Sequence, residues 1–105
     1  MVSRDSLPQG LLSDVKNYLN ITWDDEATDA KISGFIASGI VYLNLKYGEE
    51  ADYTVDGMPR TLLMEYARYA RDSALDVFEN NYQALILGMQ NERLVTNVEE
   101  TIQAE

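Results

Sequence analysis

Two clusters of carboxylates are the side chains in this chain best suited to chemistry. The first comprises Asp24, Asp25, Glu26 and Asp29, and the second comprises Glu49, Glu50, Asp52 and Asp56. Paired carboxylates can cleave glycosidic bonds, and carboxylate oxygens are ligands for Mg²⁺. Neither cluster adjoins a glycine-rich phosphate loop, and the second lacks the alternating ligands and terminal Glu of a calcium loop. We therefore expect no enzyme activity, no catalytic or cofactor-binding residue and no metal site.

The overall composition excludes most other catalytic machinery. The chain has 105 residues with no cysteine and no histidine, so it lacks an imidazole base, a thiolate zinc site and a disulfide framework. Its formal net charge is −10, from 8 basic and 18 acidic residues. Because nucleic-acid affinity comes largely from Lys and Arg on phosphates, sequence-specific DNA binding is not expected. No secretory signal or membrane-spanning run is recognisable, which favours a protein made in the cytoplasm.

The hydrophobic pattern predicts an all-α fold, a small four- to five-helix bundle. A first helix should follow Pro8 and stop near Asn20. A second should open at the first carboxylate cluster and end near Tyr47, where Gly48 supplies a stop. We expect a long loop or short hairpin over Gly48–Met58, since Asp56-Gly57 is a turn pair. A third helix should run from Pro59 to about Glu79.

The remainder of the chain predicts a fourth helix and a tail. The fourth helix should cover Tyr82 to about Leu94, with Asn80 and Asn81 separating it from the third. Thr96 and Glu99 have capping-box spacing for a further short helix. Residues 1–94 should thus form one helical domain, and residues 95–105 a tail or short partner-binding helix.

The predicted third helix is amphipathic. Its apolar side carries Leu63, Tyr66, Ala67, Ala70, Ala74, Val77 and Phe78, and the opposite side carries Glu65, Arg68, Asp72, Asp76 and Glu79. We interpret the charged side as a solvated face, with a docking face as the alternative.

The predicted second helix has no charged residue between Lys31 and Lys46. Its side opposite the expected core carries small residues and two larger apolar ones, which we call the uncharged strip: Ala30, Gly34, Ala37, Ser38, Val41 and Leu45. A helix that is apolar all round needs cover on both sides. We therefore expect the uncharged strip to contact another subunit. The alternative is a central helix buried wholly within its own monomer.

Two further segments are candidates for binding a partner. Tyr53 and Val55 lie in the long connection, which is either an assembly arm or a mobile loop. Val95, Val98 and Ile102 lie in the C-terminal segment at helical spacing, which favours an amphipathic element that orders on a partner over a frayed tail.

The stretch from Pro59 to Tyr82, PRTLLMEYARYARDSALDVFENNY, resembles the third helix of head-tail connector (adaptor) proteins of tailed bacteriophages. It is most similar to the form found in phages and prophages of Gram-positive bacteria. The segment Leu11–Ile21 with its following acidic residues is similar to the opening helix of that family, and the second helix ends at a corresponding Tyr47-Gly48. The resemblance covers roughly residues 10 to 90.

The resemblance implies a non-catalytic head-completion protein at the head-tail interface of a virion, assembled in the cytoplasm of a bacterial host. It implies a ring, expected to be dodecameric, through which DNA passes. Its partners would be further copies of itself, the portal protein and the next head-completion or tail protein. Val95, Val98 and Ile102 would then engage the portal. A negatively charged lumen would reduce adhesion of the passing DNA.

Two other functions remain open from the sequence. The strong negative charge is also the composition of a DNA mimic or inhibitor protein, although the carboxylates fall in clusters and not along one face at phosphate-like spacing. The carboxylate clusters keep open a Mg²⁺-dependent hydrolase, for which Mg²⁺-dependent thermal stabilisation would be the test.

Overall fold

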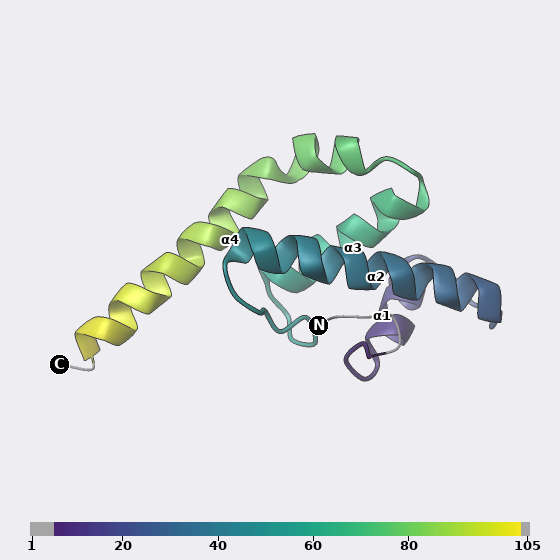
Figure 1. The fold of residues 1–105 in the computed structure, drawn as a ribbon, viewed down its shortest axis with the longest axis horizontal. Helices are drawn as coiled ribbons and strands as arrows, with labels where there is room; N and C mark the ends of the chain where they lie inside the picture. The colour runs from purple at the N-terminus through teal and green to yellow at the C-terminus, as the bar shows by residue number, and fades with distance from the viewer. Residues whose placement is uncertain (1–5, 104–105) are drawn as a thin grey trace.

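The computed structural model describes the backbone of residues 6–103 and the side chains of residues 6–94. It contains four helices: α1 (Leu11–Tyr18), α2 (Glu26–Tyr47), α3 (Met58–Arg71) and α4 (Leu75–Gln103). Within the described range there is no strand, so the predicted all-α bundle is confirmed (Figure 1). α2 packs on α3 and α4, and α1 packs against α2 and α3.

The ends of α2 follow the signals in the sequence. Asp25 is the N-cap, and its side chain accepts a hydrogen bond from the backbone N–H of Thr28 over 2.9 Å. Gly48 ends the helix with φ of 94°, a left-handed conformation that glycine adopts without a Cβ penalty. The predicted start at the first carboxylate cluster and the predicted end near Tyr47 are therefore both confirmed.

The connection between α2 and α3 is a loop without a hairpin. The side-chain oxygen of Asn44 on α2 accepts hydrogen bonds from the N–H of Ala51, over 3.1 Å, and from the hydroxyl of Tyr53, over 2.7 Å. Arg60 on α3 donates to the carbonyl oxygen of Tyr53 over 2.9 Å. The loop is thus tied at its middle to both of the helices that it joins.

The prediction of one helix over Pro59–Glu79 is wrong, because this segment is divided between two helices. α3 stops at Arg71, and α4 begins at Leu75 after a turn in which Ser73 has φ of 56°. Neither glycine nor proline marks this break. The reversal lays α4 back along α3, which buries Phe78 but leaves Val77 exposed.

The C-terminal half of the chain forms one long helix and not two. α4 runs through Asn80 and Asn81 and through the predicted cap at Thr96 without interruption. Its C-terminal end projects beyond the other helices (Figure 1), and the molecule is 53 Å in its longest dimension and 22 Å in its shortest.

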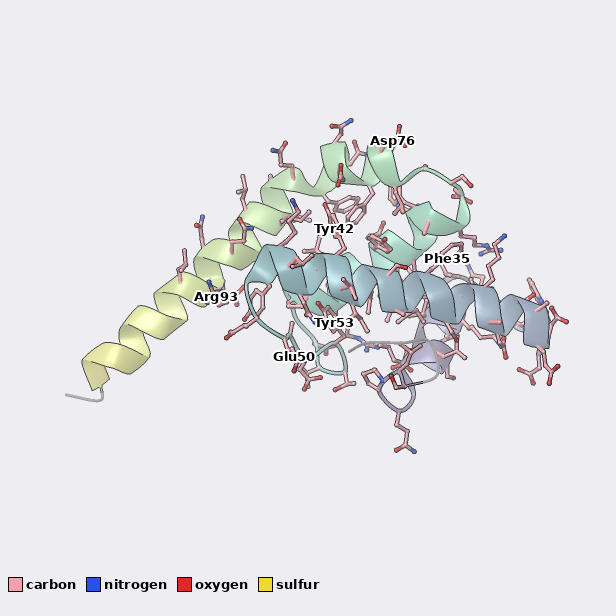
Figure 2. All side chains as sticks on the ribbon, viewed as in Figure 1. Phe35, Tyr42, Glu50, Tyr53, Asp76 and Arg93 are labelled. Atoms are coloured by element: carbon pink, nitrogen blue, oxygen red, sulfur yellow. The ribbon has the colours of Figure 1, made fainter. Side chains whose placement is uncertain are left out.

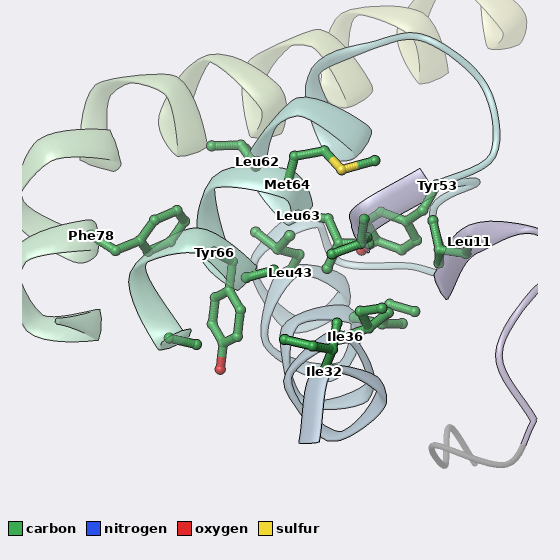
Figure 3. Close-up of a cluster of buried hydrophobic side chains, with 14 of the residues drawn as sticks. Leu11, Ile32, Ile36, Leu43, Tyr53, Leu62, Leu63, Met64, Tyr66 and Phe78 are labelled. Carbon is green, nitrogen blue, oxygen red and sulfur yellow. The ribbon is translucent and has the colours of Figure 1, made fainter. Parts of the chain in front are cut away.

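The core lies where α1, α2 and α3 meet and extends along the N-terminal half of α4 (Figure 3). The largest side chains that are completely enclosed are Phe78, Leu11, Ile36, Leu43, Leu62, Leu63, Met89 and Val15. Around Phe78, the rings of Tyr42, Tyr66, Tyr69 and Tyr82 pack at centroid distances of 5.1 to 6.3 Å. Edge-to-face and stacked rings of this kind join α2, α3 and α4.

Candidate assembly surface

The uncharged strip forms the outward side of α2. The core side of this helix carries Ile32, Ile36 and Leu43, and α2 lies in front of α1 and α3 in the view of Figure 1. On the outward side Ala30 and Ser38 are exposed, and Gly34 and Ala37 are half-buried. Val41 exposes 46% of its surface and Leu45 exposes 79%. The described part of the chain therefore leaves this apolar side of α2 uncovered, contrary to the alternative of a helix buried wholly in its own monomer.

The two glycines in the middle of α2 have different surroundings. A Cβ added at Gly39 would lie 2.7 Å from Cδ1 of Leu63 and 2.8 Å from Cδ1 of Tyr66, so this glycine allows α3 to approach closely. A Cβ added at Gly34 would meet no atom within 4 Å. Of these two, only Gly39 is needed for packing inside this chain.

The C-terminal end of α2 is held by α4. Gln90 donates from Nε2 to the carbonyl oxygen of Lys46 over 2.6 Å. The guanidinium of Arg93 lies 5.9 Å from the ring centre of Tyr47 and against Gly48. A cation beside the last turn interacts favourably with the helix dipole. The uncharged strip consequently lies on a helix that is fixed at this end.

The two candidate residues of the connection have opposite environments. Tyr53, labelled below α2 in Figure 2, is 2% exposed and belongs to the core, and its hydroxyl donates to the side-chain oxygen of Asn44. The expectation that the side chain of Tyr53 contacts a partner is therefore wrong. Val55 is more than half exposed at the outer end of the loop and remains accessible.

The three C-terminal candidates, Val95, Val98 and Ile102, lie in the part of α4 whose side chains are outside the described residues. Their backbone is helical and continuous with the rest of α4. Leu94, the last described side chain, is about half exposed.

The first carboxylate cluster stabilises local structure. Asp25 accepts from both the N–H and the hydroxyl of Thr28, and these hydrogen bonds lower its pKa. Lys16, which is largely buried on α1, lies 2.7 Å from Oδ1 of Asp29 and 3.3 Å from Oδ1 of Asp24. The neighbouring Asp29 is the main cause of the raised pKa of Lys16.

The second cluster is similar in one respect, since Asp52 accepts from the N–H of Thr54 over 2.9 Å and also bonds its hydroxyl. These hydrogen bonds lower the pKa of Asp52. Across the described residues, no group of three or more acidic side chains is arranged to hold a metal ion. None of the helices, within that same part of the chain, is both long and apolar enough to cross a membrane.

Glu65 occupies a site that the sequence did not predict. It was expected on the solvated side of its helix, but it is 8% exposed and lies among α1, α3 and α4. Tyr18 from α1 and Tyr82 from α4 donate their hydroxyl hydrogens to its carboxylate, the latter over 2.8 Å. Arg68 donates from Nε and Nη2 over 3.0 and 2.7 Å. The signal available in the sequence was Arg68, three residues away, whereas both tyrosines come from distant positions.

The partners of Glu65 decide its charge. Burial alone would raise the pKa of this carboxyl, but the hydrogen bonds from Tyr18, Arg68 and Tyr82 outweigh burial and hold the pKa below its usual value. Glu65 is therefore an ionised, satisfied group that joins three helices. It has no free position for a substrate, so we assign it to the fold.

Comparisons with protein-family models, curated proteins and solved structures found no match to this chain.

Proposed function

We propose that this chain is a structural assembly protein, a head-tail connector subunit of a tailed bacteriophage or prophage. In this proposal several copies form a ring beneath the portal, with DNA passing through the channel. The observation that carries it is the uncovered apolar side of α2, on which Leu45 is 79% exposed. Exposed apolar surface of this kind marks interaction sites on soluble proteins.

The specific biological role in this proposal comes from the resemblance of residues 59–82 to the connector family. The projection of α4 beyond the other helices (Figure 1) supports a role for its end in contacting a neighbouring ring. The net charge of −10 suits a lumen that DNA must pass without adhesion. The portal and the next head-completion or tail protein are the partners that follow from this role.

The DNA-mimic alternative has less support. Asp25 and Asp52 accept hydrogen bonds from their own chain, and Asp24 and Asp29 are paired with Lys16. These carboxylates are used to cap a helix, shape a loop and neutralise a buried lysine. A mimic would need carboxylates free and spaced along one surface.

The test is to mix the purified protein with portal rings from phages of Gram-positive bacteria and to measure the mass of the complexes in solution. Wild type should form a ring on the portal. Val41→Glu should prevent ring formation, because a charge would enter a dry contact between copies. Val77→Glu is the matched control, since Val77 is exposed to a similar extent, 42% against 46%, but lies on α4 away from the uncharged strip. A wild-type protein that stays monomeric with and without portal would contradict the proposal, as would equal behaviour of the two variants.

A further inference from the structure

The spacing of the residues in the uncharged strip is symmetric about its midpoint. Its six residues are separated by steps of four, three, one, three and four residues, with the midpoint between Ala37 and Ser38. The small residues Ala30 and Gly34 lie toward one end, and the larger Val41 and Leu45 lie at equal distances toward the other.

Such a pattern fits a contact between two copies related by a two-fold axis. In an isologous contact, residue i of one copy meets residue j of the other, and j meets i in return. If two α2 helices lie antiparallel with the axis at the midpoint, Leu45 falls at the level of Ala30 of the second copy, and Val41 falls at the level of Gly34. Each large side chain then has a small residue opposite it at both ends of the contact.

The surroundings of Gly34 leave room for a second copy to approach α2 closely. A glycine in a helix interior costs about 1 kcal/mol relative to alanine. Gly39 has an internal reason, because α3 packs directly against it, but a Cβ at Gly34 would meet nothing within 4 Å. No unusual backbone conformation requires glycine there either, since Gly10, Gly48 and Gly57 are the glycines with positive φ among the described residues. Gly34 therefore leaves open space on the outward side of α2, into which a side chain of a second copy would fit.

The charge distribution allows the contact to be dry. No charged residue lies between Lys31 and Lys46, so the one charged residue within the span of the strip is the exposed Lys31, beside Ala30 at its N-terminal end. Asp25, Glu26 and Asp29 lie at the first turns of α2, outside the strip.

We propose that the free protein forms a two-fold dimer through antiparallel pairing of α2 with α2 of a second copy, with the axis between Ala37 and Ser38. An isologous pair closes on itself and cannot extend into a ring. We call this dimer the reserve dimer. It covers the uncharged strip in the free protein, and ring assembly replaces this contact with the contacts of the ring. This last step rests on the proposed function, whereas the dimer itself does not.

The absence of cysteine makes the geometry directly testable by disulfide trapping. In Ser38→Cys, the two introduced thiols lie about 1.5 Å apart along the helix axis, so mild oxidation should link nearly all chains in pairs. In Ala30→Cys, each thiol lies at the level of Leu45 of the other copy. The two thiols are then 15 residues, or about 22 Å, apart along the helix axis, so no disulfide should form. The double variant A30C/L45C should link again.

Sedimentation of the unmodified protein supplies the second measurement. The mass of wild type in solution should increase with protein concentration from 11.9 kDa, the mass of one chain, toward twice that value. Gly34→Leu should remain folded, as its circular dichroism would show, and should raise the dimer dissociation constant about tenfold or more, because the added side chain holds the helices apart. A monomeric wild type at all concentrations overturns the dimer. Efficient linking of the single variant Ala30→Cys overturns the antiparallel register.

The two proposals fail separately. If wild type binds portal rings but never dimerises when free, the reserve dimer is wrong and the connector role stands. If the dimer forms with the expected links but no portal binds, the connector role is wrong and the dimer stands. Oxidised Ser38→Cys should not join portal rings until it is reduced, and equal binding before and after reduction would overturn the reserve role.

Discussion

Tyr82 on α4 donates its hydroxyl hydrogen to the carboxylate of Glu65 on α3 over 2.8 Å, at a point where that carboxylate also receives Tyr18 from α1. The carboxylate of one buried residue thus joins three of the four helices. Charge-assisted hydrogen bonds are stronger than neutral ones, so replacing this carboxylate by a neutral group weakens the contacts among these helices.

Glu65→Gln should lower the free energy of unfolding by about 1 to 3 kcal/mol, the usual cost of leaving buried polar groups poorly satisfied. Urea denaturation followed by circular dichroism measures this loss. Glu79→Gln is the control, because Glu79 also accepts a tyrosine hydroxyl, that of Tyr42 over 3.1 Å, but is exposed. Equal losses in the two variants would show that Glu65 does not have the structural role assigned to it.

Acid should remove the contribution of Glu65 in a defined direction. Its pKa in the folded protein is lower than in the unfolded chain, where a glutamate titrates near pH 4.3. The stabilisation is therefore complete above about pH 4.3 and is lost as the pH falls through the lower folded pKa. The difference in unfolding free energy between wild type and Glu65→Gln should therefore shrink as the pH falls below about 4.3. A difference that stays constant over this range would contradict the assignment.

High pH should destabilise the protein through ionisation of tyrosines in the aromatic cluster around Phe78. Burial, and then the hydrogen bond to Glu79, raise the pKa of Tyr42 to about 12. The hydrogen bond to Glu65, and then burial, raise the pKa of Tyr82 to about 12. Their contributions are complete below the unfolded pKa, about 10, and are lost as the pH rises through the folded values. Unfolding free energies measured from pH 9 to 12 should fall less steeply in Tyr42→Phe and Tyr82→Phe than in wild type. A wild-type profile that stays level would contradict this expectation.

How far the sequence predicts the fold is clearest from α2 and α3. α2 was predictable at both ends because its signals are local: Asp25 binds Thr28 three residues away, and Gly48 adopts its own left-handed conformation. The break after Arg71 was not predictable in this way. No Gly or Pro lies between Arg71 and Leu75, so the helical pattern of the sequence continues across the turn. The packing of the helices, and not a local sequence signal, imposes this turn.

The candidate surface likewise combines features that local sequence signals predict with features that only packing determines. The lack of charge along α2 correctly indicated an uncovered side, but periodicity could not separate Gly34 from Gly39, which face open space and α3 respectively. The burial of Tyr53 and Glu65 was not predicted, because each has a hydrogen-bond partner that lies more than one helix turn away in the sequence. Tyr53 is held by Asn44, nine residues away, and Glu65 by Tyr18, 47 residues away.

The two glycines of α2 therefore make a matched pair for a final test. Gly34→Ala should raise the unfolding free energy of the monomer by about 1 kcal/mol, because alanine is the better helix former and its Cβ meets nothing. Gly39→Ala gains the same propensity, but its Cβ would lie 2.8 Å from the ring of Tyr66, and the resulting repacking should cost about 1 to 3 kcal/mol. Thermal unfolding at a concentration low enough to keep the protein monomeric compares them. If Gly34→Ala is the more damaging change, α2 presents its other side to the core, and the uncharged strip cannot be the surface that joins two copies.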